Sequence, residues 1–342
     1  MLFRSLPIDR VFSMQGFGTV VTGTLVDGVL KLNDEVNIYP EDIPVKVRGI
    51  QTYGNDTDEA FAGQRTAVNL SGIKKENVTR GSVLAASSAV TVTNMLDVEM
   101  SVFKSSDRQI LNNSRVHLYT GSTEVLAKVI IMDRDVMVSG DKASVQLRLE
   151  EPVAVRREDK FIIRFYSPVI TVGGGRVLDA NPEKHKRNRD DVLADFRVLA
   201  AGDIEDIIHL KAGKWKYYKE HELGHELGLT AAEIKQAVQS LADQGKVIIL
   251  ADGSIVSEEK LKILEDTVSK IIEEYHSQNP MVDGIPKREL LSRIKEYHHI
   301  EDDKLGQAII SKFLDSGMLE DKEKTISDRK STRLNSSHQY YL

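Results

Sequence analysis

The most recognisable chemical spacing in the sequence belongs to His221, Glu222 and His225, which form a literal H-E-x-x-H string. On one helix this spacing would place two imidazoles on a common face, where they could bind zinc while the glutamate acts as a base. No well-placed third ligand follows the string. Leu223 and Leu227 are needed as the buried face of the same helix, so we expect exposed histidines and no metal site.

Two glycine-rich strings invite a phosphate-binding interpretation, G-F-G-T-V-V-T-G at residues 16–23 and G-G-G-R at residues 173–176. Neither has the spacing of a phosphate loop or a dinucleotide fingerprint ahead of a helix. Glycines before Thr-Val-Val-Thr instead indicate a tight turn or bulge at a strand, where a side chain would clash. No Ser-His-Asp order or paired carboxylates stand in a recognisable setting, so we predict no catalytic residues in this chain.

Basic residues cluster in two places. The first cluster could contact an RNA backbone, and it comprises Lys184, Lys186, Arg187 and Arg189. The second mixes Lys211, Lys214, Lys216 and Lys219 with Trp215, Tyr217 and Tyr218, which suits RNA backbones and stacked bases. A solvated linker and a buried aromatic anchor explain the two clusters equally well, and the sequence leaves both interpretations open.

Composition limits the class of protein that holds these residues. The chain has 342 residues, 41% of them hydrophobic, with a net charge of -6 and no cysteine. Disulfide frameworks, zinc ribbons, iron–sulfur clusters and thiol nucleophiles are therefore excluded. The absence of a signal-peptide layout, and of any apolar run near the roughly 20 residues of a membrane span, predicts a cytoplasmic protein without a membrane partner. The acidic balance argues against a uniformly basic nucleic-acid binder.

The first half of the chain has the period-two alternation of strands. It is clearest at residues 143–149, and it recurs at 45–50, 96–100 and 161–165. Alternation is lost near residue 90, so we expect one β-barrel over residues 1–90 and a second over 91–180.

The hydrophobic period changes to about 3.6 after residue 181. Helical faces, a capping box at 230–233 and an Asp-Gly turn at 252–253 predict a linker and a first winged helix over residues 181–257. The same order recurs over 258–328, where Gly317 follows Gly245 by 72 positions, which predicts a second winged helix. Residues 329–342 have no period, so we expect a disordered or non-native tail.

Particular stretches resemble a known family. Residues 6–12 and 16–24 resemble the second domain of translational GTPases of the elongation factor Tu type. Residues 63–70, 80–81 and especially 167–179 are similar to the bacterial selenocysteine-specific elongation factor. The resemblance covers about residues 2–328. It implies a multidomain fold in which two all-β barrels, corresponding to translation-factor domains II and III, precede two α+β winged-helix domains.

The resemblance also implies a function. The family delivers selenocysteinyl-tRNA to the ribosome at recoded UGA codons, and its terminal winged helices bind an mRNA hairpin. GTP and magnesium belong to an N-terminal GTPase domain, whereas this sequence opens where the second domain begins. The family normally has four winged helices, with the hairpin contact in the last ones, and two are counted here. We therefore expect a tRNA-binding fragment without a cofactor, catalysis or the hairpin contact.

The resemblance assigns an aminoacyl pocket to Asp9, Arg10 and Arg65. A selenol is more acidic than a thiol or an alcohol, so two fixed guanidiniums would favour the selenolate over serine or cysteine. Asp9 would orient an arginine and bind the amino group of the esterified residue. The alternative at this site is an ordinary ion pair at a barrel rim. The alternative function is a winged-helix nucleic-acid-binding regulator with β-barrel domains, although its expected recognition helix offers only Lys235 and Gln236 to a groove.

Overall fold

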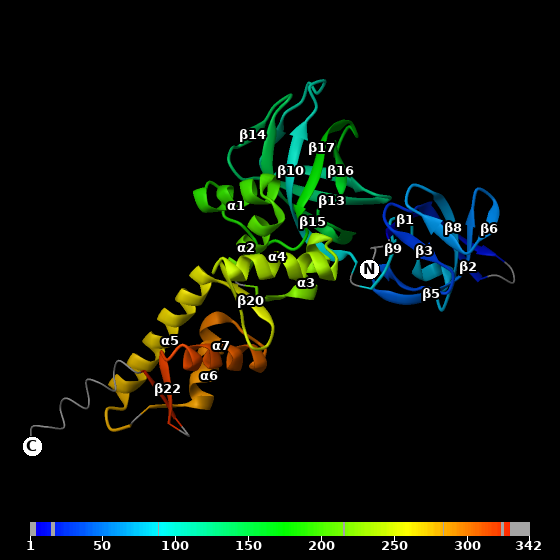
Figure 1. Ribbon diagram of the computed structural model, residues 1–342. Helices are drawn as coiled ribbons and strands as arrows, with labels where there is room; N and C mark the ends of the chain where they lie inside the picture. Colours follow the sequence, from blue (N-terminus) through cyan, green and yellow to red (C-terminus); the bar gives the residue numbers. More distant parts are fainter. Residues whose placement is uncertain are drawn as a thin grey trace, which may run out of the picture. The chain divides into compact units, whose positions relative to one another are not determined.

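The structure is a computed structural model, and it describes residues 5–14, 18–87, 89–214, 216–282, 284–322 and 325–328. The chain divides into two compact units, residues 1–202 with 224–232, and residues 203–223 with 233–342. In Figure 1 the first half of the chain consists mainly of strands and the second half mainly of helices. The tail expected over 329–342 lies outside the described residues.

The first barrel is a ring of six strands. The order β4-β9-β1-β2-β8-β5 closes through pairing between β4 and β5. The short strand β6 pairs antiparallel with the end of β5, and β3 pairs with β7. Alternate side chains point into one core that includes Ile8, Val21 and Val68. The elements are β1 (Ser5–Met14), β2 (Gly18–Thr24), β3 (Val29–Lys31), β4 (Glu35–Tyr39), β5 (Ile43–Thr52), β6 (Asn55–Thr57), β7 (Glu59–Phe61), β8 (Arg65–Ser71), a 3-10 helix (Lys75–Asn77) and β9 (Val83–Ala85).

The second barrel is a closed ring in the order β10-β15-β13-β12-β16-β17, and β11 pairs with β14 beside it. The alternation expected at 143–149 and 161–165 lies in β15 and β16, with Val145, Leu147 and Ile163 fully buried. The strands are β10 (Thr91–Val102), β11 (Ile110–Leu111), β12 (Arg115–Thr120), β13 (Thr123–Ile131), β14 (Val136–Met137), β15 (Lys142–Val155), β16 (Lys160–Phe165) and β17 (Thr171–Asp179).

Both glycine strings serve strand packing. Gly175 lies in β17, where an added Cβ would clash with the backbone carbonyl of Glu99 on β10. Gly23 lies in β2, where a Cβ would clash with the carbonyl of Pro7 on β1. Gly18, the described glycine before Thr-Val-Val-Thr, has a positive φ of 85°, which fits the predicted turn, but an added Cβ would meet nothing within 4 Å, so the expected clash is absent at that position. Gly16 and Phe17 lie outside the described residues.

The two barrels contact each other within the first unit. The Arg156 guanidinium lies 2.6 Å from the Asp27 carboxylate, and the Thr123 hydroxyl donates a hydrogen bond of 2.6 Å to the Gly81 carbonyl. These contacts join two turns of the second barrel, between β15 and β16 and between β12 and β13, to loops of the first.

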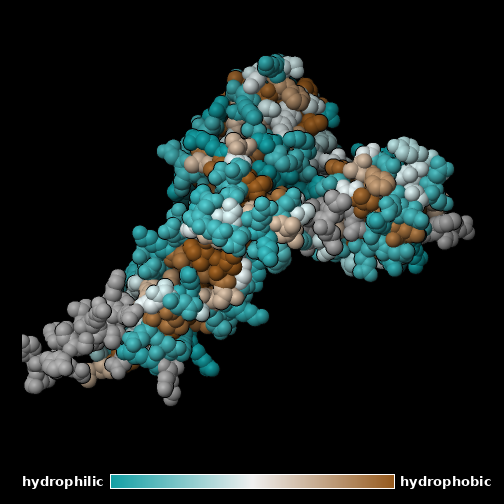
Figure 2. Space-filling view, in the orientation of Figure 1, coloured by the Kyte–Doolittle hydropathy of each residue, from teal (hydrophilic) through white to brown (hydrophobic). Residues whose placement is uncertain are grey.

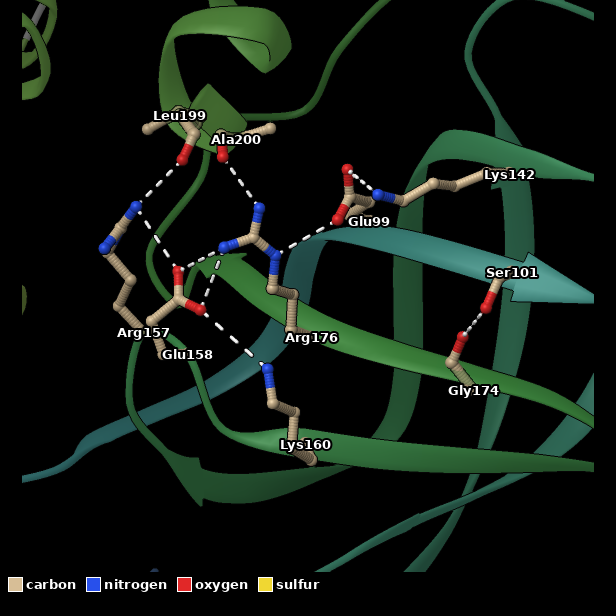
Figure 3. A network of polar contacts seen from close by, with 10 residues as sticks. All are labelled: Glu99, Ser101, Lys142, Arg157, Glu158, Lys160, Gly174, Arg176, Leu199 and Ala200. Atoms are coloured by element: carbon tan, nitrogen blue, oxygen red, sulfur yellow. Dashed lines mark hydrogen bonds and ion pairs between the residues drawn. The ribbon is translucent and has the colours of Figure 1, made fainter. Parts of the chain in front are cut away.

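Helix α1 (Asp190–Ala201) is held on the second barrel at its C-terminal end (Figure 3). Arg157 donates to the Leu199 carbonyl at 2.9 Å, and Arg176 donates to the Ala200 carbonyl at 2.7 Å. Glu99 and Glu158 hold the Arg176 guanidinium in turn. Cations at a helix C-terminus satisfy the last carbonyls and interact favourably with the helix dipole.

Two winged helices follow α1. Their three-stranded sheets have the orders β18-β20-β19 and β21-β23-β22. Gly245 and Gly317, 72 positions apart, both have a positive φ just after a helix, as the expected repeat requires. The elements are α2 (Ile204–Gly213), β18 (Tyr218–Lys219), α3 (Glu220–Leu227), α4 (Ala231–Asp243), β19 (Val247–Ile249), β20 (Ser254–Ser257), α5 (Glu258–Gln278), β21 (Ile285–Pro286), α6 (Lys287–His298), α7 (Asp303–Asp315), β22 (Leu319–Lys322) and β23 (Thr325–Asp328).

The surface is mainly hydrophilic in the view of Figure 2, with hydrophobic side chains gathered on the second unit near the first turns of α5. Ile263 of α5 is half exposed. None of the helices in the described part of the chain combines the length and apolar content that a membrane crossing requires.

Candidate functional site

A β-bulge on β1 positions the first two candidate residues. Ile8 pairs with Gly23 and Arg10 pairs with Thr22, so Asp9 is an extra residue on β1. Directly paired residues of an antiparallel ladder point to the same face of the sheet. Arg10 therefore shares the outer face with Thr22, and the Thr22 hydroxyl also donates to Asp9 at 2.9 Å. The bulge thus presents two consecutive polar residues outward, because the local alternation is broken.

Arg65, at the start of β8, completes the constellation on the same face. Its Nη1 lies 2.5 Å from Oδ2 of Asp9, and its Nη2 lies 3.0 Å from Oδ1. This two-point arrangement fixes the plane of the guanidinium. The Arg65 side chain is 52% exposed and that of Asp9 is 33% exposed, so the pair faces solvent at the rim.

The electrostatics of the site favour an anion. Hydrogen bonds from Arg65 lower the pKa of the Asp9 carboxyl below its usual 3.8, so this group is ionised at neutral pH. Arg10 lies close enough to contribute to the same shift, yet no described residue hydrogen-bonds or pairs with its guanidinium. Two guanidiniums and one carboxylate leave a single uncompensated positive charge.

A cavity of about 530 Å³ lies on the same face of the barrel. Val20, Ala67 and Asn69 line it, and Ala67 pairs with Thr22, the residue that binds Asp9. Ala67 lies two residues after Arg65 on β8, so the cavity adjoins the Asp9–Arg65 pair. Our sequence reasoning missed it, although the small outward residues Gly49 and Ala67 were a usable signal.

The second barrel carries an aromatic and cationic cluster that the sequence reasoning also missed. His117 stacks on Tyr166 with ring centres 5.5 Å apart, and the guanidinium of Arg115 lies 5.1 Å from the Tyr166 ring centre. Arg164 lies 5.6 Å from the ring centre of Tyr119. We call these five residues of β12, β16 and the loop after β16 the aromatic face. The alternation R-V-H-L-Y at 115–119 was its signal in the sequence.

The four cations predicted to contact RNA differ in their surroundings. Arg187 donates to the carbonyls of Ile131 and Arg134 and pairs with Asp135, so its guanidinium anchors the linker to the second barrel. Arg189 pairs with Asp191 at 2.6 Å. Lys184 and Lys186 are exposed, and no contact to another described residue is seen for either ammonium.

The second basic group belongs largely to the fold. Lys211 and Tyr218 are buried, and the ammonium of Lys216 lies 4.4 Å from the Tyr218 ring centre. The ammonium of Lys260 lies 3.5 Å from the ring centre of Tyr217, whose burial raises its pKa to about 12. The buried-anchor interpretation is therefore favoured here, while Trp215 lies outside the described residues.

The H-E-x-x-H string lies on α3, with Leu223 and Leu227 buried as expected. His221 is exposed, but His225 is only half exposed, contrary to expectation. The Glu222 carboxylate accepts a hydrogen bond of 2.9 Å from the Lys219 backbone amide, which satisfies a free donor at the start of the helix. Over the described ranges, no group of three or more His, Asp or Glu side chains could hold a metal ion.

Comparison with known proteins gives a consistent class. Residues 18–85 match elongation factor Tu domain 2, residues 97–184 match the β-barrel domain of selenocysteine-specific elongation factor, and residues 270–327 match the winged helix of elongation factor SelB. The fold and its domain order are those of a translation elongation factor, and the expected two barrels followed by winged helices are confirmed.

Individual relatives narrow the class. A selenocysteine-specific elongation factor of Desulfomicrobium baculatum is 34% identical over 331 residues, covering 93% of this chain and 50% of the relative. One from Haemophilus influenzae is 31% identical over 183 residues, covering 53% and 29%. The crystal structure of a bacterial selenocysteine-specific elongation factor, EF-Sec, has the same fold, with a TM-score of 0.72 at 20% identity, covering 97% of this chain and 51% of that one.

The chain belongs to the family of selenocysteine-specific elongation factors. It spans about half the length of the curated relative that it matches over most of its own length. The matches do not favour the alternative of a winged-helix regulator.

Proposed function

We propose that this chain binds the aminoacyl end of selenocysteinyl-tRNA on the outer face of its first barrel, for selenocysteine incorporation at UGA codons. The observation that carries the proposal is the constellation of Arg10 and Arg65 with Asp9 on one exposed face. The selenolate of selenocysteine would neutralise the one uncompensated positive charge there. Seryl and cysteinyl groups are neutral near pH 7, so they would gain less from the same guanidiniums.

The cavity beside this pair would hold the terminal nucleoside of the tRNA. An aminoacyl-tRNA carries its amino acid on the ribose of that nucleoside, so the two binding places must adjoin. Apolar walls at Val20 and Ala67 suit a base, and Gln51, Asp56 and Asn69 offer hydrogen-bonding groups.

The aromatic face of the second barrel would contact the body of the tRNA. Stacked aromatic rings with interleaved guanidiniums suit RNA backbones and exposed bases. Tyr166 is 52% exposed and so is accessible to such a partner. Lys184 and Lys186 would add contacts to phosphates.

The wider activity follows from the family. GTP and magnesium would act in a GTPase domain of the kind that elongation factors carry, and no residue of this chain is proposed as catalytic. The ribosome and an mRNA hairpin would be further partners, the latter through winged helices. We further propose that the domains follow the expected boundaries of 1–90, 91–180, 181–257 and 258–328.

The test compares selenocysteinyl-tRNA with seryl-tRNA on the same tRNA body. We expect Arg65→Ala and Arg10→Ala each to weaken selenocysteinyl-tRNA binding about 10-fold or more, because a charge-assisted contact is lost, and to weaken seryl-tRNA binding less. The matched control is Lys46→Ala, which removes an exposed cation from β5 of the same barrel. Equal losses for the two tRNAs would refute the selenolate role.

A further inference from the structure

A second β-bulge lies on the same face of the first barrel, on a strand that carries none of the three aminoacyl-pocket residues. On β5, Val47 pairs with Leu70 and Gly49 pairs with Asn69, so Arg48 is an extra residue. Leu70 is buried in the barrel core, whereas Asn69 faces outward into the cavity. Because Gly49 pairs with Asn69, Gly49 also lies on the outer face. The exposed Arg48 therefore joins Gly49 there, as Arg10 joins Asp9 on β1.

Gly49 leaves room for the cavity beside Arg48. A Cβ at Gly49 would lie 3.6 Å from the Asn69 Cβ, so any larger side chain would extend into the space that Asn69 lines. Arg48 is the only cation among the described residues that line the cavity. No described residue hydrogen-bonds or pairs with its guanidinium, although two carboxylates, Asp56 and Asp58, line the same cavity.

The two carboxylates restrict where an anion could bind. The Asp56 carboxylate accepts a hydrogen bond of 2.8 Å from Gln51, which holds its negative charge on the β6 side. A phosphate would be repelled from that side, whereas carboxylates can accept hydrogen bonds from hydroxyl and amine groups. An unpaired guanidinium, with five donors in a planar fork, suits a phosphate. The cavity is thus polarised between a cationic and an anionic wall.

We infer that Arg48 binds the phosphodiester on the 5′ side of the terminal adenosine of the tRNA. This inference rests on the proposed function, which puts that nucleoside in the cavity. The guanidinium would then fix the acceptor end at its phosphate, while Arg10 and Arg65 hold the amino acid at the other end. The two bulges, on the two strands that flank the β2–β8 pair, would together set the register of the aminoacyl nucleotide on the barrel.

The experiment uses two small ligands and the full chain. One ligand is 3′-deoxy-3′-(selenocysteinylamino)adenosine, kept reduced, and the other is the same compound with a 5′-phosphate. The amide replaces the labile ester. Binding of each is measured by calorimetry for the wild type, Arg48→Ala, Arg48→Lys and Lys46→Ala. Lys46 is an exposed cation on the same strand that does not line the cavity, so it controls for net charge.

We expect the wild type to bind the phosphorylated ligand about 10-fold more tightly than the other, as a charge-assisted contact predicts. The preference should vanish in Arg48→Ala, persist in part in Arg48→Lys, and remain in Lys46→Ala. Affinity for the ligand without phosphate should be unchanged in Arg48→Ala, which also shows that this variant is folded.

Each other outcome is decisive. If the wild type binds both ligands equally, or if Arg48→Ala retains the preference, the phosphate contact is refuted while the aminoacyl site stands. If the wild type binds neither ligand, at concentrations where it also fails to bind selenocysteinyl-tRNA, the proposed function falls and the inference with it. If it binds the tRNA but neither ligand, the nucleoside does not occupy the cavity, and the role of Arg48 is refuted.

Discussion

Asp9 has hydrogen-bonding capacity beyond its contacts within the barrel. Its Oδ1 accepts from Thr22 and from Nη2 of Arg65, and its Oδ2 accepts from Nη1 of Arg65. An ionised carboxylate offers about four acceptor sites, so three contacts leave one. The α-ammonium of a bound aminoacyl group would fit this remaining site, because it is a cation with three donors.

Asp9→Asn tests this division of roles. The variant loses a negative charge, so binding of the α-ammonium should weaken, and seryl-tRNA affinity should fall about 10-fold. Selenocysteinyl-tRNA should lose less, because the two guanidiniums are then uncompensated and attract the selenolate more strongly. Filter binding with the two aminoacyl-tRNAs measures both effects. Asp9→Asn should thus weaken seryl-tRNA more, whereas Arg65→Ala should weaken selenocysteinyl-tRNA more.

Seryl-tRNA acetylated on its amino group supplies the control for that variant. This tRNA lacks the ammonium, so Asp9→Asn should weaken its binding little further. Acetylation and the substitution would each remove the same contact between the ammonium and Asp9. A full additional loss with the acetylated tRNA would mean that Asp9 acts only by orienting Arg65.

At the scale of elements, a buried polar cluster connects the linker to the second barrel. Asp97 of β10 is 1% exposed, and its carboxylate lies 2.6 Å from Nε2 of His185 and accepts a 2.9 Å hydrogen bond from Gln146. Gln146 also donates to the Glu183 carbonyl. This cluster positions the segment that carries Lys184 and Lys186, two of the cations proposed to contact RNA.

Burial raises the pKa of the Asp97 carboxyl, with a further contribution from Asp179, although His185 and Gln146 act in the opposite direction. A raised pKa in the folded state means that this group's contribution is most favourable below pH 3.8 and is lost as pH rises through the folded-state pKa. We therefore expect Asp97→Asn to match the wild type in thermal stability near pH 4 and to exceed it at pH 7. A variant that is less stable at pH 7 would show that the paired charge is net stabilising.

Elements with a regular period were predictable, and departures from regularity were not. Alternation at 143–149 and the helical spacing at 192–200 determine buried faces directly, so β15 and α1 lie where the pattern predicts. The bulges at Asp9 and Arg48 change a side chain's face without changing the local pattern, because pairing with distant strands sets the register. The aromatic face likewise depends on the pairing of β12 with β16. The position of the Arg187 guanidinium depends on hydrogen bonds to carbonyls about fifty residues away in the sequence.

At the scale of the whole molecule, the positions of the charged residues matter more for tRNA binding than the net charge does. The chain carries a net charge of -6, which would oppose a polyanion such as tRNA. Arg10, Arg48 and Arg164 are nevertheless all in the first compact unit, on the barrels, whereas the charge of Arg115 there is compensated by Glu150 at 2.6 Å. RNA binding depends on such local cations, since each phosphate contact releases counterions. The proposed tRNA contacts are therefore assigned to the barrels and to the segment that carries Lys184 and Lys186, and the winged helices are left for other partners.

Selectivity between charged tRNAs as a function of pH tests the selenolate site most directly. Asp9 has a pKa below 3.8 and arginine stays protonated, so between pH 6.5 and about 9 these protein groups keep their charge. The ligand changes instead, since a thiol ionises near pH 8.5 and a selenol well below that. Seryl-tRNA is the reference, because it has the same titrating amino group as the other two tRNAs but a side chain that does not ionise in this range.

The measurement is the affinity of the full chain for selenocysteinyl-, cysteinyl- and seryl-tRNA across this range. Selenocysteinyl-tRNA should be preferred over cysteinyl-tRNA about 10-fold or more near pH 7, and the preference should shrink as the thiol ionises, because both ligands then carry an anion. Arg65→Ala should reduce the preference at every pH. A preference over cysteinyl-tRNA that does not change with pH, or none over seryl-tRNA at pH 7, would contradict recognition of the selenolate by Arg10 and Arg65.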